Sequence, residues 1–334
     1  MNKTARALLL AIALPAIAAA RDYSVFDVVG DSVSAGVNPE CAGYGWVQML
    51  FGQSACANPS QDETLTNLWP GITQYNSAVS GSKASEWADT NSYPYLGTVL
   101  NHDPNLVVVM IGGNDLIAYA GDGVFSETEQ GQLRTNLMAI IGMLQSNTPP
   151  PEIVMANYYD LFDGYSTNLS LLYSNYWAAS AATITADEII RNVAESKGCF
   201  FADVYSNFMH HCYGVDLGDP SHLSPDYVRR PLSPLNFDIH PVTAGHESLY
   251  KLIYDRLLVL KDIPRFVRLE WRTNEVVLEW TSGINQSYVV QRSASLVAPE
   301  GFSAIQTNAS TPTLNVHTTS VGGLDRAFYR IKVE

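Results

Sequence analysis

The sequence predicts a three-layer α/β/α domain built on a parallel sheet, followed by a small all-β sandwich. Short apolar strand patterns alternate with helical patterns as far as Leu260, and after Pro264 only strand patterns separated by turn-rich segments remain. Alternating strands and helices favour a parallel sheet covered on both faces, whereas consecutive short strands favour a sandwich. Of the 334 residues 46% are hydrophobic, which is enough to bury a large core.

The expected strands of the first domain are short, β-branched or aromatic, and bounded by Gly, Pro, Asn or Asp. They are Val25–Val29, Ile72–Val79, Leu106–Ile111, Ile153–Asn157 and Cys199–Tyr205. The expected helices carry apolar residues at helical spacing. They are Gly45–Leu50, Gln132–Leu144, Leu169–Lys197 and Thr243–Leu260.

The part of the chain after Leu260 has no helical pattern. Its expected strands are Val267–Trp271, Val276–Trp280, Tyr288–Arg292 and Phe328–Val333. The sequence therefore predicts a larger domain over residues 21–263 and a sandwich module over residues 264–334.

The first twenty residues have the pattern of a signal peptide. Lys3 and Arg6 precede the apolar run Ala7–Ala18, which is too short to span a bilayer. Ala18-Ala19-Ala20 matches a small-x-small cleavage site, so we expect cleavage after Ala20 and a secreted or periplasmic mature protein without a transmembrane segment.

The charge of the chain argues against nucleic acid as a partner. The net charge is −14, with 19 Lys and Arg against 33 Asp and Glu, and no basic patch offsets it. Residues 21–263 carry a net −17 and residues 264–334 a net +1. The acidity therefore belongs to the first domain, which also disfavours binding to anionic lipid surfaces.

Export to an oxidising compartment favours disulfide bonds between cysteines close in sequence. The expected pairs are Cys41–Cys56 and Cys199–Cys212, although four cysteines allow three connectivities and buried free thiols are the alternative.

Three candidate functional groups stand at expected strand ends. Ser32 follows the first strand within Gly30-Asp31-Ser32 and precedes a helix start, where free N–H groups favour developing negative charge. Gly81 follows the second strand, and Asn114 follows the third within Gly112-Gly113-Asn114-Asp115. Backbone and amide N–H groups of this kind can bind an oxyanion, although each motif alone also fits a turn or a helix cap.

A late histidine, His240 in Asp238-Ile239-His240-Pro241, completes a set that resembles the SGNH or GDSL-type esterase/lipase family. The resemblance covers about Val25 to Leu260 and rests on Gly-Asp-Ser at 30–32, Gly81, Gly112-x-Asn114-Asp115 and Asp238-x-His240-Pro241, in family order. It implies an SGNH-hydrolase-like, flavodoxin-like fold and a secreted serine ester hydrolase.

The resemblance also implies the role of each site residue. Ser32 would be the nucleophile, His240 the general base and acid, and Asp238 the carboxylate that orients His240. The N–H groups of Ser32 and Gly81 and the Asn114 amide would form the oxyanion hole. The family places its acid three residues before the histidine, whereas Asp238 lies two before His240, so a Ser–His dyad oriented by a main-chain carbonyl is the alternative.

The expected substrate is a short-to-medium acyl ester or lipid, small or polymer-borne, and the alternative within this class is an acetyl group on a polysaccharide. An inactive exported binding protein on a hydrolase scaffold is the alternative of another class. We see no cofactor site, and His210, His211 and His222 lack the fixed spacing of metal ligands.

Two further segments have two interpretations each. The aromatic stretch Asn157–Tyr165 is expected either to line the substrate pocket or to pack within a long loop, and Trp87 has the same two interpretations. The C-terminal module resembles fibronectin-type-III-like appendages, which implies either contact with a glycan or cell surface or a stabilising spacer.

Overall fold

The computed structural model describes most of the chain, in two compact units, Tyr23–Leu258 and a second unit that includes Val259–Glu334. The described residues are 23–37, 43–53, 63–119, 125–163, 177–213, 220–228, 239–262, 266–272, 275–282, 287–293, 302–309, 313–320 and 327–333. The expected signal peptide, Cys41, Cys56 and Asp238 lie outside them.

The first unit is an α/β fold, as the sequence predicts. Its strands are β1 (Val25–Gly30), β2 (Thr73–Gln74), β3 (Leu106–Met110), β4 (Glu152–Ala156) and β5 (Phe200–Ala202). Its helices are α1 (Ser32–Ala35), α2 (Trp46–Leu50), α3 (Leu65–Leu68), α4 (Ala84–Ala88), α5 (Tyr95–His102), α6 (Gly113–Tyr119), α7 (Glu127–Leu144), α8 (Trp177–Ser196), α9 (Val204–Phe208) and α10 (Thr243–Asp262).

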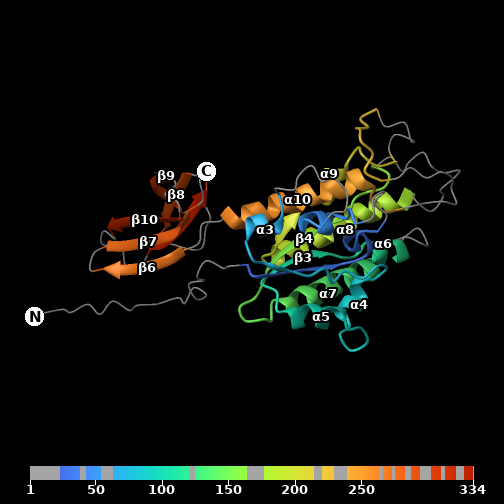
Figure 1. Ribbon diagram of the computed structural model, residues 1–334, viewed down its shortest axis with the longest axis horizontal. Coiled ribbons are helices and arrows are strands. Elements are labelled where there is room, and N and C mark those ends of the chain that lie inside the picture. The colour runs from blue at the N-terminus through green and yellow to red at the C-terminus, as the bar shows by residue number, and fades with distance from the viewer. Residues whose placement is uncertain are drawn as a thin grey trace, which may run out of the picture. The chain divides into compact units, whose positions relative to one another are not determined.

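The five strands form one parallel sheet in the order β2-β1-β3-β4-β5. Figure 1 shows α10 along one face of this sheet and α5 and α7 along the other. Helix α8 packs beside α7 and against β4 and β5. The residues of β3 are buried throughout, as expected for a central strand covered on both faces.

The strand order places a topological switch at the carboxyl ends of β1 and β3. The chain leaves β1 toward β2 on one side and returns from β2 to β3 on the other. Ligands of open α/β sheets bind at the carboxyl edge beside such a point, because the connecting loops diverge there. Ser32 lies two residues after the end of β1, and Asn114 lies four residues after the end of β3.

The second expected strand is shorter than predicted. Of Ile72–Val79 only Thr73 and Gln74 pair with β1, and the chain then leaves the sheet. Val79 instead donates its N–H to the carbonyl of Gly30 at 2.9 Å. Val79 therefore lies beside the end of β1 without belonging to β2.

The expected Cys199–Cys212 disulfide is wrong, because both thiols are free. Cys199 directly precedes β5, whereas Cys212 follows α9 and donates its backbone N–H to Asp163 Oδ2 at 3.0 Å. Strand β5 and helix α9 separate the two residues along the chain, so a short sequence separation does not bring the sulfur atoms together. Burial raises the pKa of the Cys199 thiol to about 12, which keeps it neutral and unreactive.

The second unit is all-β, with two antiparallel sheets of three strands, in the orders β10-β7-β6 and β11-β8-β9. The strands are β6 (Phe266–Arg272), β7 (Glu275–Ser282), β8 (Ser287–Ser293), β9 (Ser303–Ala309), β10 (Thr313–Ser320) and β11 (Phe328–Val333). Val276, Leu278 and Trp280 of β7 pack with Tyr288 and Val290 of β8 in one buried core.

Candidate active site

Ser32 lies at the carboxyl edge of the sheet, two residues beyond the end of β1. The side chain of Asp31 caps helix α1, because its Oδ1 accepts the N–H of Val33 at 3.0 Å. Gly36 ends the helix in the left-handed region after only one turn. Ser32 is therefore fixed at a strand-to-helix corner, with only 7% of its surface exposed.

His240 faces Ser32 from a distant part of the chain. The distance between Ser32 Oγ and His240 Nε2 is 2.9 Å. Pro241 forms an antiparallel bridge with Val228, and α10 begins two residues later. With the ring proton on Nδ1, Nε2 can accept the hydroxyl proton of Ser32, which is the geometry of a nucleophile and its base.

The loop containing Gly81 and the start of α6 are joined by hydrogen bonds. Asn114 Nδ2 donates to the Ser82 carbonyl at 3.0 Å, and Ser82 Oγ donates to the Gly30 carbonyl at 3.3 Å. Trp87 Nε1 donates to the same Ser82 Oγ at 2.8 Å. These contacts connect the chain segments that follow β1, β2 and β3.

Gly81 adopts a φ of +81°, and an added Cβ would meet no atom within 4 Å. Glycine is therefore required here by backbone conformation rather than by lack of space. Trp87 is fully buried, so the expectation that it packs in the core is the correct one of its two interpretations.

Two buried carboxyl groups lie beside the Ser32–His240 pair. Burial raises the pKa of Asp31 from 3.8 to about 6, although hydrogen bonds from Tyr158 and Val33 and positive charge on His240 lower it. Burial also raises the pKa of Asp115 to about 6, while its Oδ2 accepts the Ala84 N–H at 2.8 Å. Desolvation dominates at both carboxyl groups.

A second histidine, His246, is fully buried on α10. Its Nδ1 accepts the N–H of Trp46 at 3.4 Å, and its Nε2 donates to the Val37 carbonyl at 3.3 Å. Burial lowers its pKa to about 4. A neutral ring thus links the helix that follows His240 to the chain that follows Ser32.

The described part of the aromatic stretch, residues 157–163, lies next to the site, because Tyr158 contacts Asp31. Tyr158, Tyr159 and Phe162 are each at most 8% exposed, so they pack inside the molecule. The sequence predicts either a pocket wall or loop packing for them, and neither interpretation includes a contact with Asp31 or Ile239. Their only sequence signal is position, since they directly follow a buried strand of the parallel sheet.

The other predicted site features are partly described. Asp238 lies outside the described residues. His222 Nε2 contacts Asp226 Oδ1 at 2.8 Å, and His211 stacks on Tyr227. Within the described ranges, no group of three or more His, Cys, Asp or Glu side chains is arranged to hold a metal ion, and no helix there is long and apolar enough to cross a membrane.

Comparisons with known proteins point to one family. The model of the GDSL-like lipase/acylhydrolase family matches residues 28–247, whereas no curated protein matches the chain. Similar solved structures include a catalytic mutant of an acetylxylan esterase from Geobacillus stearothermophilus, with 16% identity and a TM-score of 0.48 over 70% of this chain and 94% of that one. Another is an alpha/beta hydrolase from the metagenome of Lake Arreo, Spain, with 18% identity and a TM-score of 0.48 over 71% and 96%.

Proposed function

The chain belongs to the GDSL-like lipase/acylhydrolase family of ester hydrolases, and we propose that it cleaves carboxylic esters through an acyl–enzyme intermediate on Ser32. The observation that carries this proposal is the 2.9 Å contact between Ser32 Oγ and His240 Nε2 at the carboxyl edge of the sheet. A serine hydroxyl is a weak nucleophile unless a base is in hydrogen-bond reach, and this contact supplies one.

The reaction proceeds in two halves. Ser32 Oγ attacks the ester carbonyl carbon while its proton moves to His240 Nε2, and the resulting imidazolium then protonates the leaving alkoxide. In the second half, His240 takes a proton from water as the hydroxide attacks the acyl carbon. The tetrahedral species collapses by expelling Ser32 Oγ, which regains its proton from His240, so the enzyme is regenerated and the acid is released.

The oxyanion of each tetrahedral species is held by N–H groups of Ser32, Gly81 and Asn114. A carboxamide has two N–H donors, and the contact of Asn114 with Ser82 uses one of them. The other is left for the oxyanion. Because the Ser82 carbonyl fixes this amide in advance, little reorganisation is needed when negative charge develops.

The acid that orients His240 is proposed to be Asp238. In an extended segment, residues two apart face the same way at about 6 to 7 Å, which lets a carboxylate approach the histidine ring. Replacing Asp238 with Asn should lower kcat by at least about a hundredfold, because the neutral side chain supports the wrong ring tautomer. Turnover close to wild type would instead favour a dyad.

The decisive experiment labels the protein with a fluorophosphonate and measures hydrolysis of nitrophenyl esters. Ser32→Ala should abolish labelling and lower kcat/KM by about a thousandfold or more. Ser34→Ala is the matched control, since Ser34 is buried two residues away and, among the described residues, makes no contact with Ser32 Oγ or His240. Equal labelling of Ser32→Ala and wild type would overturn the serine mechanism.

The acyl preference is tested with nitrophenyl esters of increasing chain length beside acetylated xylan and pectin. We propose a short-to-medium acyl ester as substrate, and activity confined to the acetylated polymers would overturn that preference. Export through residues 1–20 is likewise a proposal, tested by the N-terminal sequence of protein recovered from the culture medium or periplasm. A glycan contact through the second unit stays a prediction.

A further inference from the structure

The carboxyl end of β4 carries two adjacent buried tyrosines, and the first of them contacts Asp31, the residue that precedes the nucleophile. Tyr158 Oη lies 2.6 Å from Asp31 Oδ2 and 3.0 Å from the Met110 carbonyl. Its ring also occupies the space above Gly113, where an added Cβ would be 2.7 Å from Tyr158 Cε1. Tyr158 therefore joins β4 to the ends of β1 and β3, next to Ser32.

The second tyrosine reaches the base. Tyr159 Oη donates to the Ile239 carbonyl at 2.5 Å, and Ile239 directly precedes His240. The Tyr159 ring stacks on Phe208 of α9, with the ring centres 4.7 Å apart. Both the hydroxyl and the ring of Tyr159 are thus held in place, and the backbone that carries His240 is held by them.

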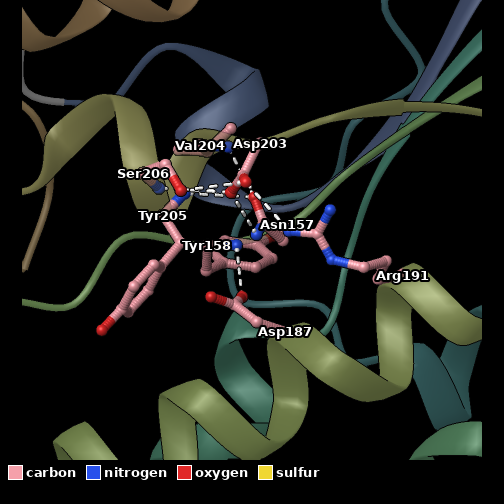
Figure 2. Close-up of polar contacts among 8 residues, drawn as sticks. All are labelled: Asn157, Tyr158, Asp187, Arg191, Asp203, Val204, Tyr205 and Ser206. Carbon is pink, nitrogen blue, oxygen red and sulfur yellow. Dashed lines mark hydrogen bonds and ion pairs between the residues drawn. The ribbon is translucent and has the colours of Figure 1, made fainter.

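The backbone at the end of β4 is itself anchored, as Figure 2 shows. Asn157 Oδ1 accepts the N–H groups of Val204 and Tyr205 at 2.5 and 3.1 Å, and its Nδ2 donates to Asp203 Oδ1 at 3.1 Å. Arg191 pairs with the other oxygen of Asp203 at 2.9 Å. The amide of Asn157 thereby fixes β4 to the start of α9.

The next residue is anchored from a second direction. The N–H of Tyr158 faces Asp187 Oδ1 of helix α8 at 3.4 Å (Figure 2). Burial raises the pKa of Asp187 to about 8, so this carboxyl is neutral over most of the physiological range and accepts through its carbonyl oxygen. The backbone that carries the two tyrosines is therefore fixed by hydrogen bonds from two directions.

We infer that Tyr158 and Tyr159 are positioning residues that set the distance between Ser32 Oγ and His240 Nε2. The inference rests on the proposed function. One dipeptide contacts the residue that precedes each reacting group, Asp31 through its carboxyl group and Ile239 through its backbone carbonyl. The reacting groups themselves come from segments 208 residues apart in sequence. A misplacement of about 1 Å between reacting groups can cost about a hundredfold in rate, so loss of either hydroxyl contact should lower kcat.

The test compares Tyr158→Phe, Tyr159→Phe and the double variant with wild type. Both single variants should lose about 10- to 100-fold in kcat with KM changed less than about twofold. The substrate still binds in these variants, but Ser32 Oγ and His240 Nε2 are misaligned. The double variant should lose less than the product of the two, since both contacts fix one distance. Tyr205→Phe is the matched control, because its hydroxyl points away from Tyr158 in Figure 2 and should leave kcat unchanged.

The pH profile separates the two tyrosines. The Tyr158 hydrogen bond lowers the pKa of Asp31, so Tyr158→Phe should raise this pKa and move the acid limb of kcat to higher pH. Tyr159→Phe should leave the limb in place. If the two tyrosines served only in folding, neither substitution would shift the acid limb of the kcat profile.

Each kcat is normalised to the sites titrated to completion by a fluorophosphonate, so that unfolded molecules do not contribute. The inference is overturned if both single variants keep wild-type kcat per titrated site while Ser32→Ala is inactive. Failure of wild type itself to label would instead overturn the proposed function.

Discussion

Replacing Asp31 with Asn should make the protein more stable and less active. In the native structure Asp31 Oδ1 accepts the Val33 N–H, while Oδ2 faces Tyr158 Oη. Asn can accept from Val33 through its oxygen and donate to Tyr158 Oη, which can then donate to the Met110 carbonyl at 3.0 Å. The substitution thus reproduces the hydrogen bonds that the protonated form of Asp31 makes to Val33 and Tyr158.

The magnitude follows from the pKa of Asp31, which burial raises from 3.8 to about 6. Between these values the folded state retains a proton that the unfolded state has lost, so stability falls as pH rises through this window. Each unit of pKa corresponds to about 1.4 kcal/mol, and the ionised Asp31 therefore costs about 3 kcal/mol above pH 6. Asn does not ionise and avoids this cost.

The assay is urea unfolding, followed by tryptophan fluorescence, at pH 4, 6 and 8. Asp31→Asn should exceed wild type by about 3 kcal/mol at pH 8 and by little at pH 4. Its kcat should be lower, because the Asp31 carboxylate and positive charge on His240 attract each other. Equal or lower stability of the variant at pH 8, or a difference independent of pH, would refute the reasoning.

A control of opposite sign is available at Asp89. Its carboxyl is exposed, and hydrogen bonds from the hydroxyl and N–H of Ser92 lower its pKa. An acid with a lowered pKa contributes stability above its unfolded pKa and loses it as pH falls. Asp89→Asn should therefore be no more stable than wild type at pH 8, which isolates the effect of burial at Asp31.

Three further predictions concern packing and a buried base. Gly113→Ala should lower kcat by about tenfold or more, because the added Cβ lies 2.7 Å from the Tyr158 ring and must displace it; ester hydrolysis by folded protein measures this, and unchanged kcat would show that the ring yields freely. His246 should destabilise the protein as pH falls from 6.5 toward 4, since its folded pKa is lowered to about 4 and the unfolded chain takes up the proton first. Urea unfolding of His246→Gln, compared with wild type, should show a weaker pH dependence in that window. Trp280→Ala should destabilise the second unit by about 3 to 5 kcal/mol, because this side chain is fully buried between its sheets. Hydrogen exchange resolved by unit should place that loss in residues 266–333 and leave residues 23–258 unchanged.

The parallel sheet could be predicted because its central strands are short and mostly apolar. Strands β1, β3 and β4 begin and end within one residue of the expected positions. Helices α4 and α9 were missed, whereas α2, which is equally short, was expected as Gly45–Leu50, because five residues give only a weak helical pattern. Strand β9 was missed because its residues are mostly exposed and polar, so no alternation marks it.

The two reacting residues of the site could also be predicted from the sequence. Ser32 and His240 could be named because a nucleophile and a base must come from a few residue types, and the family pattern gave their order. The error at Cys199 and Cys212 has a different cause. Their expected pairing rested on their separation in sequence, which does not tell in which direction the chain runs between them. A strand and a helix lie between the two residues.

The supporting residues could not be predicted, because their roles depend on burial that other segments create. Asp31 follows a strand and would ionise normally if solvent reached it, but its residue surface is only 2% exposed beneath the site. Its carboxyl is therefore both the cap of the nucleophile's helix and a buried charge that costs stability. His246 is a second buried ionisable group beside the dyad. A buried carboxyl group such as Asp31 departs from the rule that interiors exclude ionisable acids, and a sequence departs from that rule mainly where function requires it. The site should accordingly be the part of this fold where substitutions that raise stability lower turnover.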